Sequence, residues 1–349
     1  MKFSNFLFPE SRSREDDGRT IKETLAEAQL SDSLGFDVIW LAEHHFDGIC
    51  AYVDPVTFAA ALAVATSRAS IGFAVAQMAL HHPTRFAEQM ALIDNISNGR
   101  LIVGLGRGTA YNVYDYQGFG IDPAEAQARL EEAEAFMIKA WHGGPLVHKG
   151  RHFDLKVPDL RPAPLTRPHP RIIRAASSEH GMVEIARAGR PFMMNVQSDA
   201  VVQSRMDLYR RTLREAGFGS DDVARLAGQC WIWRNVVVAE TDAEAERIAV
   251  PAFTAMIEQR AAMRERVRRE QGISIAPPSP PGAAPSARTT LEHGLVYGSP
   301  VTVARKLTPI LAARVGGMII QFRLGPMSFS DTAKSLRLFQ QVVVPHLEK

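Results

Sequence analysis

The residues best suited to chemistry begin with a histidine. His44 belongs to the segment Glu43-His44-His45-Phe46, which follows the short apolar run Val38–Ala42. Its imidazole can accept or donate a proton near neutral pH, so His44 is a candidate for general acid–base catalysis. A structural role in a polar loop is one alternative, and a metal site is a weaker one. The sequence lacks the His-x-His pair that zinc-binding barrels use, and adjacent side chains on a strand point to opposite faces.

Arg107 is a candidate phosphate ligand. It lies between Gly106 and Gly108, two residues after the end of the apolar run Leu101–Leu105. A guanidinium binds a phosphate through two parallel hydrogen bonds. The glycines at 104, 106 and 108 do not have the Gly-x-Gly-x-x-Gly spacing of a dinucleotide-binding loop, and no strong helix starts directly after them. The sequence therefore favours a phosphate anchor over a dinucleotide loop.

Two serines form a second candidate anion site. Ser177 and Ser178 follow the apolar run Arg171–Ala175 and open a predicted helix. Hydroxyls and free backbone N–H groups at a helix start bind anions. The runs before Arg107 and before the serines are the fourth and fifth of the chain, so two neighbouring strands would bring these groups together. This convergence predicts a phosphate site.

The third apolar run, Ser70–Ala76, ends in small residues, with Gln77 directly after it. Small side chains at a strand end would let a planar ring approach the backbone closely. The alternative is a buried strand packed on its neighbours, which the sequence alone does not exclude.

Short apolar runs alternate with amphipathic segments along the whole chain. The runs are rich in Val, Ile and Phe on both faces, as strands of a covered parallel sheet must be. The predicted strands are Phe3–Phe8, Val38–Ala42, Ser70–Ala76, Leu101–Leu105, Arg171–Ala175, Phe192–Val196, Ile232–Ala239 and Met318–Leu324. The predicted helices are Thr20–Leu34, Pro55–Thr66, Pro83–Ile96, Pro123–Trp141, Gly181–Ala188, Ala200–Ala216, Ala243–Glu270, Val301–Ala313 and Asp331–Leu347.

Eight such units in 349 residues favour a single α/β domain, a closed (β/α)8 TIM barrel, over an open sheet. In such barrels the chemistry takes place at the carboxyl ends of the strands.

Two segments depart from the alternation of strands and helices. Residues 143–170 look like an inserted hairpin and loop before the fifth strand. Residues 272–300 are rich in Pro, Ser, Ala and Gly and predict a mobile loop after the seventh strand, either over the barrel mouth or as a surface linker.

The composition excludes several classes of protein. Hydrophobic residues make up 46% of the chain, so a large core can be buried, and the net charge of +2 gives no case for a nucleic-acid or anionic-membrane partner. The longest apolar runs are too short for a membrane span. The two cysteines, Cys50 and Cys230, have no metal-ligand spacing and make no disulfide framework. Without a targeting signal, these features predict a cytoplasmic protein.

The order and spacing of several motifs resemble the bacterial luciferase-like family of flavin-dependent monooxygenases, and above all its luciferase alpha subunits. The resemblance covers nearly the whole chain. Its motifs are Met1–Leu7, Gly35–Phe46, His82–Arg85, Leu92–Leu101, Gly104–Gly108, Gly298–Pro300 and Leu338–Pro345.

The resemblance implies reduced FMN as the cofactor, which together with O2 oxygenates a small organic substrate. A separate NAD(P)H:flavin reductase would supply the reduced FMN, because the chain has no nicotinamide-binding motif. A homodimer is also implied. By position, the resemblance implies that His44 is the acid–base residue beside the flavin ring. It implies that Ala74 and Val75 lie under the ring, joined by a peptide bond that is often cis in the family. It also implies that the phosphate is held by Arg107, Ser177 and Ser178, and that Gly108 and Tyr111 line the ribityl or ring side.

The chain also differs from the luciferase alpha subunits. They carry a reactive cysteine where this chain has Gly106, an acidic residue where it has Ala176, and a different loop at 272–300. These differences favour a general monooxygenase over a light-emitting one that takes long-chain aldehydes.

Three alternatives remain open. One is a deazaflavin-dependent oxidoreductase on the same fold, and another is a non-catalytic flavin-binding protein, against which His44 argues. A metal-dependent hydrolase is the most remote. Trp231, Trp233 and Arg234, around the seventh strand, are candidates for the substrate wall, with core packing and a surface charge as the alternative interpretation.

Overall fold

Eight parallel strands close into a barrel in the computed structural model of the chain, which describes residues 1–108, 112–176, 178–273 and 294–348. β12 pairs with both β10 and β1, so the predicted (β/α)8 barrel is confirmed. The strands follow one another around the barrel in chain order, as helical crossovers between parallel neighbours require. They are β1 (Lys2–Leu7), β2 (Val38–Leu41), β3 (Ser70–Phe73), β5 (Leu101–Gly106), β8 (Arg171–Ala176), β9 (Phe192–Met194), β10 (Trp231–Val238) and β12 (Gly317–Gln321).

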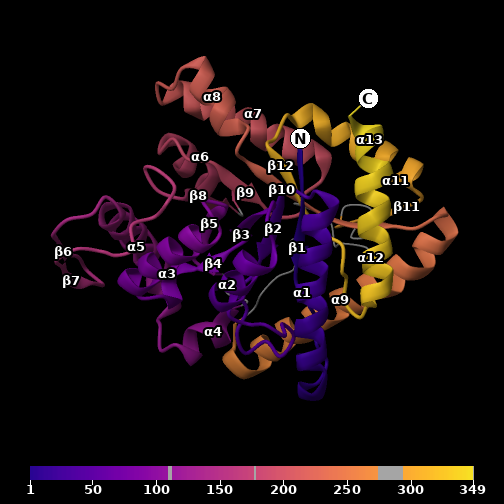
Figure 1. Cartoon of the computed structure of the whole chain (residues 1–349), viewed down its shortest axis with the longest axis horizontal. Helices are drawn as coiled ribbons and strands as arrows, with labels where there is room; N and C mark the ends of the chain where they lie inside the picture. The colour runs from indigo at the N-terminus through magenta and orange to yellow at the C-terminus, as the bar shows by residue number, and fades with distance from the viewer. Residues whose placement is uncertain (109–111, 177, 274–293, 349) are drawn as a thin grey trace.

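Helices surround these strands (Figure 1). Their starts carry the expected capping residues: Ser13 caps α1, and Asp54 accepts the backbone N–H groups of Val56 and Thr57 at the start of α2. The helices are α1 (Arg14–Leu34), α2 (Pro55–Ala65), α3 (Pro83–Ile96), α4 (Val113–Gly118), α5 (Ala126–Trp141), α6 (Glu179–Arg187), α7 (Asp199–Glu215), α8 (Ser220–Ala227), α9 (Asp242–Gln271), α11 (Pro300–Leu307), α12 (Phe329–Leu338) and α13 (Val344–Leu347).

Two tryptophans fill the barrel interior. Trp40 and Trp231 meet edge to face with ring centroids 5.1 Å apart, and the Trp40 indole N–H donates to Ser4 Oγ at 2.9 Å. Glycine leaves the room that each ring needs: a Cβ at Gly72 would overlap Trp40, and one at Gly317 would overlap Trp231. The interior is therefore a packed core, and chemistry belongs to the strand ends.

The third strand is interrupted near its end. The run predicted as one strand forms β3 and the short strand β4 (Ala76–Gln77), and the Ala74–Val75 peptide bond between them is cis, as the resemblance implies. β4 pairs with β5, with Ala76 opposite Leu105. Ala74 and Val75 are left half-buried at the carboxyl end of the barrel.

The segment predicted as an insertion before β8 contains an antiparallel hairpin. Its strands are β6 (Leu146–Lys149) and β7 (Asp154–Val157), which pair from Leu146 opposite Val157 to Lys149 opposite Asp154. Figure 1 shows this hairpin projecting from the barrel beside α5.

The prediction of a mobile loop over the whole of 272–300 is wrong at the end of that segment. Residues 274–293 lie outside the described part of the chain. Beyond them, β11 (Leu295–Gly298) pairs in parallel with the end of β10, where Asn235–Val238 extend past the barrel. The free backbone groups of β10 and the burial of Leu295 explain why these residues form a strand despite the polar composition around them.

Two helical features were also not predicted. The short helices α4 and α8 were missed, and the last predicted helix is divided by a π-helical turn at Phe339–Val343 into α12 and α13. α12 packs beside α1 (Figure 1), so the two ends of the chain close the barrel together.

Candidate active site

His44 lies three residues beyond the end of β2, at the carboxyl end of the barrel. Its side chain is 29% exposed, and its Nδ1 lies 3.1 Å from Asp47 Oδ2. The ring of Phe8, just after β1, meets the imidazole edge to face with centroids 4.9 Å apart. One side of His44 is therefore held by a carboxylate, and another is covered by an aromatic ring.

Aromatic side chains continue from His44 into the barrel. Phe8 stacks on Phe6 at 6.1 Å, and Phe6 meets Trp233 of β10 at 4.3 Å. Trp233 is half-buried, so of the three predicted wall residues it alone keeps a place beside the strand-end site.

The other two candidates for the substrate wall have structural positions. Trp231 is buried deeper in the barrel against Trp40. The buried Arg234 forms an ion pair with Asp199 of α7 at 2.5 Å. Trp231 therefore has the core-packing role that was the alternative to a place in the substrate wall. Arg234 is a buried charge with an acidic partner, not a surface charge.

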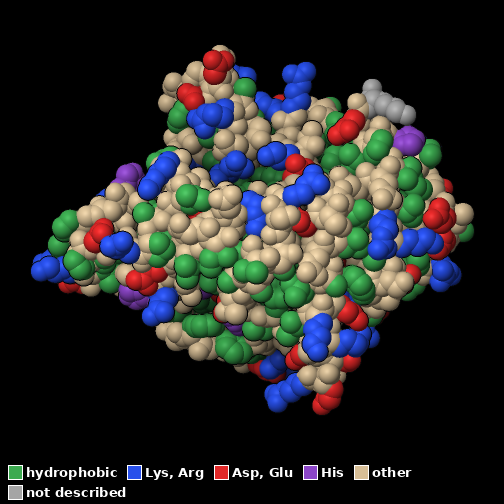
Figure 2. Space-filling view, viewed as in Figure 1, with side chains coloured by type: hydrophobic (Ala, Val, Ile, Leu, Met, Phe, Trp, Pro, Cys, Tyr) green, Lys and Arg blue, Asp and Glu red, His purple; other side chains and the backbone are tan. Residues whose placement is uncertain are grey.

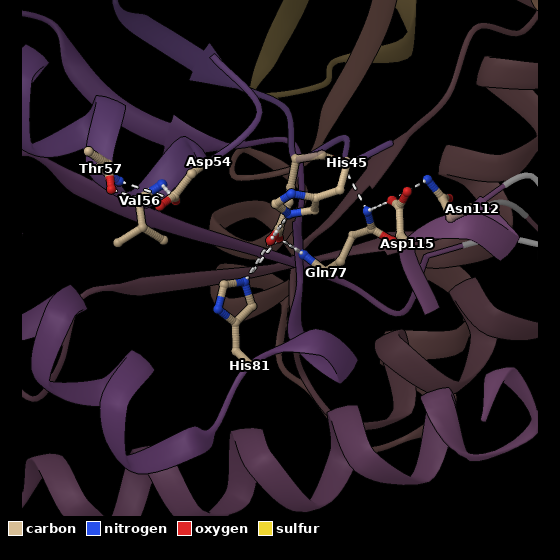
Figure 3. A network of polar contacts seen from close by, with 9 residues as sticks. His45, Asp54, Val56, Thr57, Gln77, His81, Asn112 and Asp115 are labelled. Carbon is tan, nitrogen blue, oxygen red and sulfur yellow. Dashed lines mark hydrogen bonds and ion pairs between the residues drawn. The ribbon is translucent and has the colours of Figure 1, made fainter. Parts of the chain in front are cut away.

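A fully buried carboxylate lies next to His44 in the sequence. Glu43 accepts contacts from His45 Nε2 at 3.0 Å and from His81 Nε2 at 2.9 Å, and its other oxygen accepts the backbone N–H of Gln77 at 2.6 Å. Figure 3 shows the rings of His45 and His81 directed toward one another from different segments. Glu43 thus ties the end of β2 to the turn that follows β4.

The electrostatics of this cluster favour an ionised Glu43. Burial acts to raise its pKa, but the neighbouring His81 and the hydrogen bonds from His45, His81 and Gln77 outweigh burial and lower the pKa to about 2. Burial acts to lower the pKa of His45, but Glu43 outweighs it and raises that pKa above its usual value. A buried anion of this kind needs hydrogen-bond donors around it, and His45, His81 and the backbone N–H of Gln77 supply them.

Gln77 extends the cluster toward β5. Its side-chain amide donates to the Glu43 carbonyl at 3.0 Å and to Asp115 Oδ2 of α4 at 2.6 Å (Figure 3). Burial raises the pKa of Asp115. The hydroxyl of Tyr116, the next residue in α4, donates to the carbonyl of Arg107. The ends of β2, β4 and β5 are therefore joined by buried hydrogen bonds.

Glycine permits the close approach of these strand ends. Gly106 packs against Val75, and a Cβ at position 106 would overlap the Val75 Cγ2 methyl group. Gly108 has a φ of +81°, and a Cβ there would meet Gln77 Oε1 and the Tyr116 hydroxyl. The absence of a cysteine at position 106 thus has a steric basis, because Val75 occupies the space that a side chain would need.

Arg107 and Ser178 follow neighbouring strands. β5 and β8 pair with Leu105 opposite Arg174, and continuing this register places Arg107 level with Ala176, at the end of β8. Arg107 is exposed, and its guanidinium makes no ion pair among the described residues. Ser178 is the N-cap of α6 and accepts the backbone N–H of Gly181 at 3.2 Å. Tyr111 and Ser177 lie outside the described residues.

Sequence reasoning missed most of the polar cluster. His45 could have been found, because residues two apart on an extended chain face the same side, which places His45 with Glu43. Nothing local marks His81 or Asp115, each of which lies 38 residues from its partner in the cluster. Asp47 was missed as well, although it lies only three residues from His44.

The described residues contain no group of three or more His, Cys, Asp and Glu side chains placed to hold a metal ion. In the same part of the chain, no helix is long and apolar enough to cross a membrane. Cys50 and Cys230 are buried and free.

Comparisons with known proteins agree with this architecture. The crystal structure of monooxygenase RslO1 from Streptomyces bottropensis shares 27% sequence identity with this chain, covers 99% of both chains and superposes with a TM-score of 0.82. The oxygenating constituent of 3,6-diketocamphane monooxygenase from Pseudomonas putida, solved in complex with FMN, is 20% identical over 99% of this chain and 98% of that chain, with a TM-score of 0.79.

A third solved structure has the same fold and a different cofactor in its description. The coenzyme F420-dependent tetrahydromethanopterin reductase from Methanopyrus kandleri is 17% identical, covers 99% of both chains and has a TM-score of 0.71. Likeness at this level of identity shows the fold alone. The family model described as luciferase-like monooxygenase matches residues 1–314. The chain therefore belongs to the family of luciferase-like, flavin-dependent monooxygenases.

Proposed function

We propose that the protein is an FMN-dependent monooxygenase that uses reduced FMN and O2 to oxygenate a small organic substrate. The observation that carries the proposal is the arrangement at the carboxyl end of the barrel. His44 follows β2, and the half-buried Ala74 and Val75 follow β3. The exposed Arg107, which has no ion pair among the described residues, follows β5. An acid–base group and a phosphate ligand are thus separated by a stretch of small side chains.

The residues present fit a flavin mononucleotide. Arg107 and the N-terminus of α6, with Ser177 and Ser178, would hold the phosphate, because a guanidinium and free N–H groups both bind anions. Ala74 and Val75 would lie under the ring, and Gly108 and Tyr111 would line the ribityl or ring side. The overlap that any side chain at Gly106 would cause with Val75 supports a site built around these small residues.

Bound in its reduced form, FMN supplies the electrons that activate O2, so that one oxygen atom enters the substrate and the other leaves as water. The protein's part is positioning and proton transfer. His44 would hold or deliver a proton at its Nε2, the ring nitrogen that does not face Asp47. Phe8, Phe6 and Trp233 would keep water away from the reacting groups, because they form an apolar wall next to His44.

The test combines binding and turnover. FMN titration of the purified protein is expected to quench flavin fluorescence with a defined stoichiometry, and a supplied NAD(P)H:flavin reductase is expected to support substrate oxygenation and O2 consumption. A protein that binds neither oxidised nor reduced FMN and transfers no oxygen when the reductase is present would contradict the proposal.

The second candidate is hydride transfer with a deazaflavin, which the F420-dependent fold neighbour motivates. The two cofactors separate the candidates, since an oxygenated product formed with reduced FMN and O2 supports the monooxygenase and substrate reduction with reduced F420 supports the alternative. A non-catalytic flavin-binding protein would bind FMN and turn over neither.

Three further expectations belong to the same proposal. A separate NAD(P)H:flavin reductase supplies the reduced FMN. The protein works in the cytoplasm, where the free thiols of Cys50 and Cys230 would stay reduced. It also forms a homodimer through the neighbouring helices α2 and α3, which expose Val64, Leu92 and Ile96. Figure 2 shows hydrophobic side chains gathered on the face where Figure 1 places these helices.

A further inference from the structure

Asp47 is arranged to hold His44 in one orientation. Its Oδ2 lies 3.1 Å from His44 Nδ1, and its side chain is 9% exposed. Both atoms are buried, and among the described residues neither has a hydrogen bond of normal geometry, either to the other or elsewhere, so their 3.1 Å contact is an ion-pair approach. Among the described residues, Asp47 Oδ2 is therefore the polar atom that faces His44 Nδ1, and His44 Nδ1 is the polar atom that faces Asp47 Oδ2.

The Asp47 carboxylate is itself fixed. Its Oδ1 accepts the backbone N–H groups of Ile49 at 2.8 Å and Cys50 at 3.3 Å, which leaves Oδ2 directed to the histidine. Burial acts to raise the pKa of Asp47, but the contact with His44 and these two backbone donors outweigh it and hold the pKa below its usual value. The carboxylate is thus an anion, with acceptors only, throughout the neutral range.

An acceptor at Nδ1 determines where the proton of a neutral imidazole resides. Because Asp47 Oδ2 cannot donate, a proton on Nδ1 makes the contact attractive, whereas an unprotonated Nδ1 would place a lone pair against the anion. The contact therefore favours the neutral imidazole with its proton on Nδ1 and with Nε2 unprotonated. The Phe8 ring on the imidazole limits rotation of the side chain to another arrangement. The nitrogen away from Asp47 is then the one that exchanges protons with bound molecules.

We propose that Asp47 is a positioning residue that fixes the Nδ1-protonated tautomer of His44 and so presents Nε2 as the proton-exchanging atom. The inference deepens the proposed function and rests on it for its catalytic meaning. The tautomer itself is a property of the protein without any bound molecule.

The decisive variant is Asp47→Asn. Its amide oxygen can still accept from Ile49 and Cys50, while its NH2 group would face His44 Nδ1 and act as a donor. The variant therefore keeps the shape of the loop and reverses the preferred tautomer, moving the proton to Nε2. We expect kcat to fall by about 10²-fold or more, as for loss of a positioned acid–base group, with little change in the KM for substrate or in FMN affinity.

The tautomer is read directly by ¹⁵N NMR of protein labelled at histidine, with the His44 signals assigned by their loss in His44→Gln. Wild-type protein is expected to show a protonated Nδ1 and an unprotonated Nε2, and Asp47→Asn the reverse. The matched control is Asp54→Asn. Like Asp47, Asp54 accepts two backbone N–H groups, but its carboxylate caps α2 and does not face His44. It is expected to leave both the His44 signals and kcat as in wild type.

The outcomes separate the two levels of the proposal. An unprotonated Nδ1 in the wild type, or full activity in a folded Asp47→Asn protein, overturns the positioning role. Thermal unfolding of the variant shows whether it is folded, and the wild-type spectrum tests the tautomer even if it is not. If the wild type shows the expected tautomer but neither binds FMN nor oxygenates a substrate, the proposed function fails and the positioning of His44 stands.

Discussion

His44 and His45 are neighbours in the sequence with opposite surroundings. His45 turns to the buried Glu43, where it helps to neutralise a carboxylate that ties two strand ends together. His44 turns the other way, toward Asp47 and Phe8 at the barrel mouth. The alternation of side chains along an extended segment separates these tasks. One histidine therefore belongs to the scaffold, and the other is available for proton transfer.

The first prediction concerns His44. Replacing it with Ala should lower turnover by about 10²- to 10⁴-fold, the usual contribution of a general acid or base. FMN affinity should barely change, because the proposed phosphate ligands Arg107 and Ser178 follow other strands. Fluorescence titration gives the affinity, and reductase-coupled assays give kcat and KM.

The matched control is His142→Ala, since His142 is exposed at the end of α5 and contacts the Ile138 carbonyl. A His44→Ala protein with normal turnover, or one whose defect is a loss of FMN binding alone, would remove His44 from the acid–base role.

At the scale of elements, β5 lies so close to the interruption between β3 and β4 that a Cβ at Gly106 would overlap Val75. Gly106→Ala should displace Val75 and so weaken FMN binding, with a loss of stability of about 1–3 kcal/mol from overpacking. Val75→Ala in the same chain removes the colliding methyl groups and should restore most of both losses. Flavin titration and chemical unfolding of the two single variants and the double variant measure this coupling.

Gly18→Ala is the control for this series, because Gly18 lies in α1 with open space around it, and the added methyl group should stabilise the helix by about 0.5–1 kcal/mol. Additive effects of Gly106→Ala and Val75→Ala would show that the two positions do not compete for space.

The packing of α1 on the barrel includes a buried acid. Burial raises the pKa of Glu27 to about 7, although Asn5 donates to its carboxyl group at 2.9 Å and Arg323 lies near. The folded protein therefore keeps a proton on Glu27 between about pH 4.5 and pH 7, where the unfolded chain has lost it. Stability must fall as the pH rises through this range, because the folded state binds more protons.

Glu27→Gln should remove this pH dependence, since a neutral amide can still accept from Asn5. Above pH 7 the variant should be more stable than wild type by at most about 3 kcal/mol, the upper limit set by the pKa difference. Urea unfolding at several pH values measures the effect, with the exposed Glu88→Gln as control. An unchanged slope between pH 4.5 and pH 7 would mean that Glu27 is ionised in the folded protein.

Regular elements could be predicted from the sequence because their signals are local. Apolar runs of the right length marked the eight barrel strands, and Asp54 before Pro55 marked the start of α2. β11 could not be predicted, because it forms only where β10 continues beyond the barrel and offers free hydrogen-bonding groups. The contact between His81 and Glu43 could not be predicted either, because it too depends on tertiary structure: it forms only when the barrel closes.

At the scale of the whole molecule, the barrel separates the proposed chemistry from the proposed assembly. The candidate site residues follow strands β2, β3, β5 and β8 at the carboxyl end of the barrel. The exposed apolar side chains of α2 and α3 lie on the barrel's flank, and that of Val64 is 78% exposed. Exposed apolar side chains gathered on two neighbouring helices are typical of an interface between protein chains. Assembly could then change without altering the site.

The last prediction uses this separation. Val64→Asp combined with Leu92→Asp should convert the expected dimer into a monomer, because two buried like charges per subunit would face each other across a two-fold interface. Sedimentation velocity measures the mass, and FMN titration of the same samples should give an affinity close to that of wild type. The control is Val147→Asp in the β6–β7 hairpin, which changes an apolar residue whose exposure lies between those of Val64 and Leu92 and which is away from this face. A monomeric wild type would refute the dimer, and a double variant that stays dimeric would assign the interface to another surface. A monomer that loses FMN binding would mean that each site depends on the neighbouring subunit.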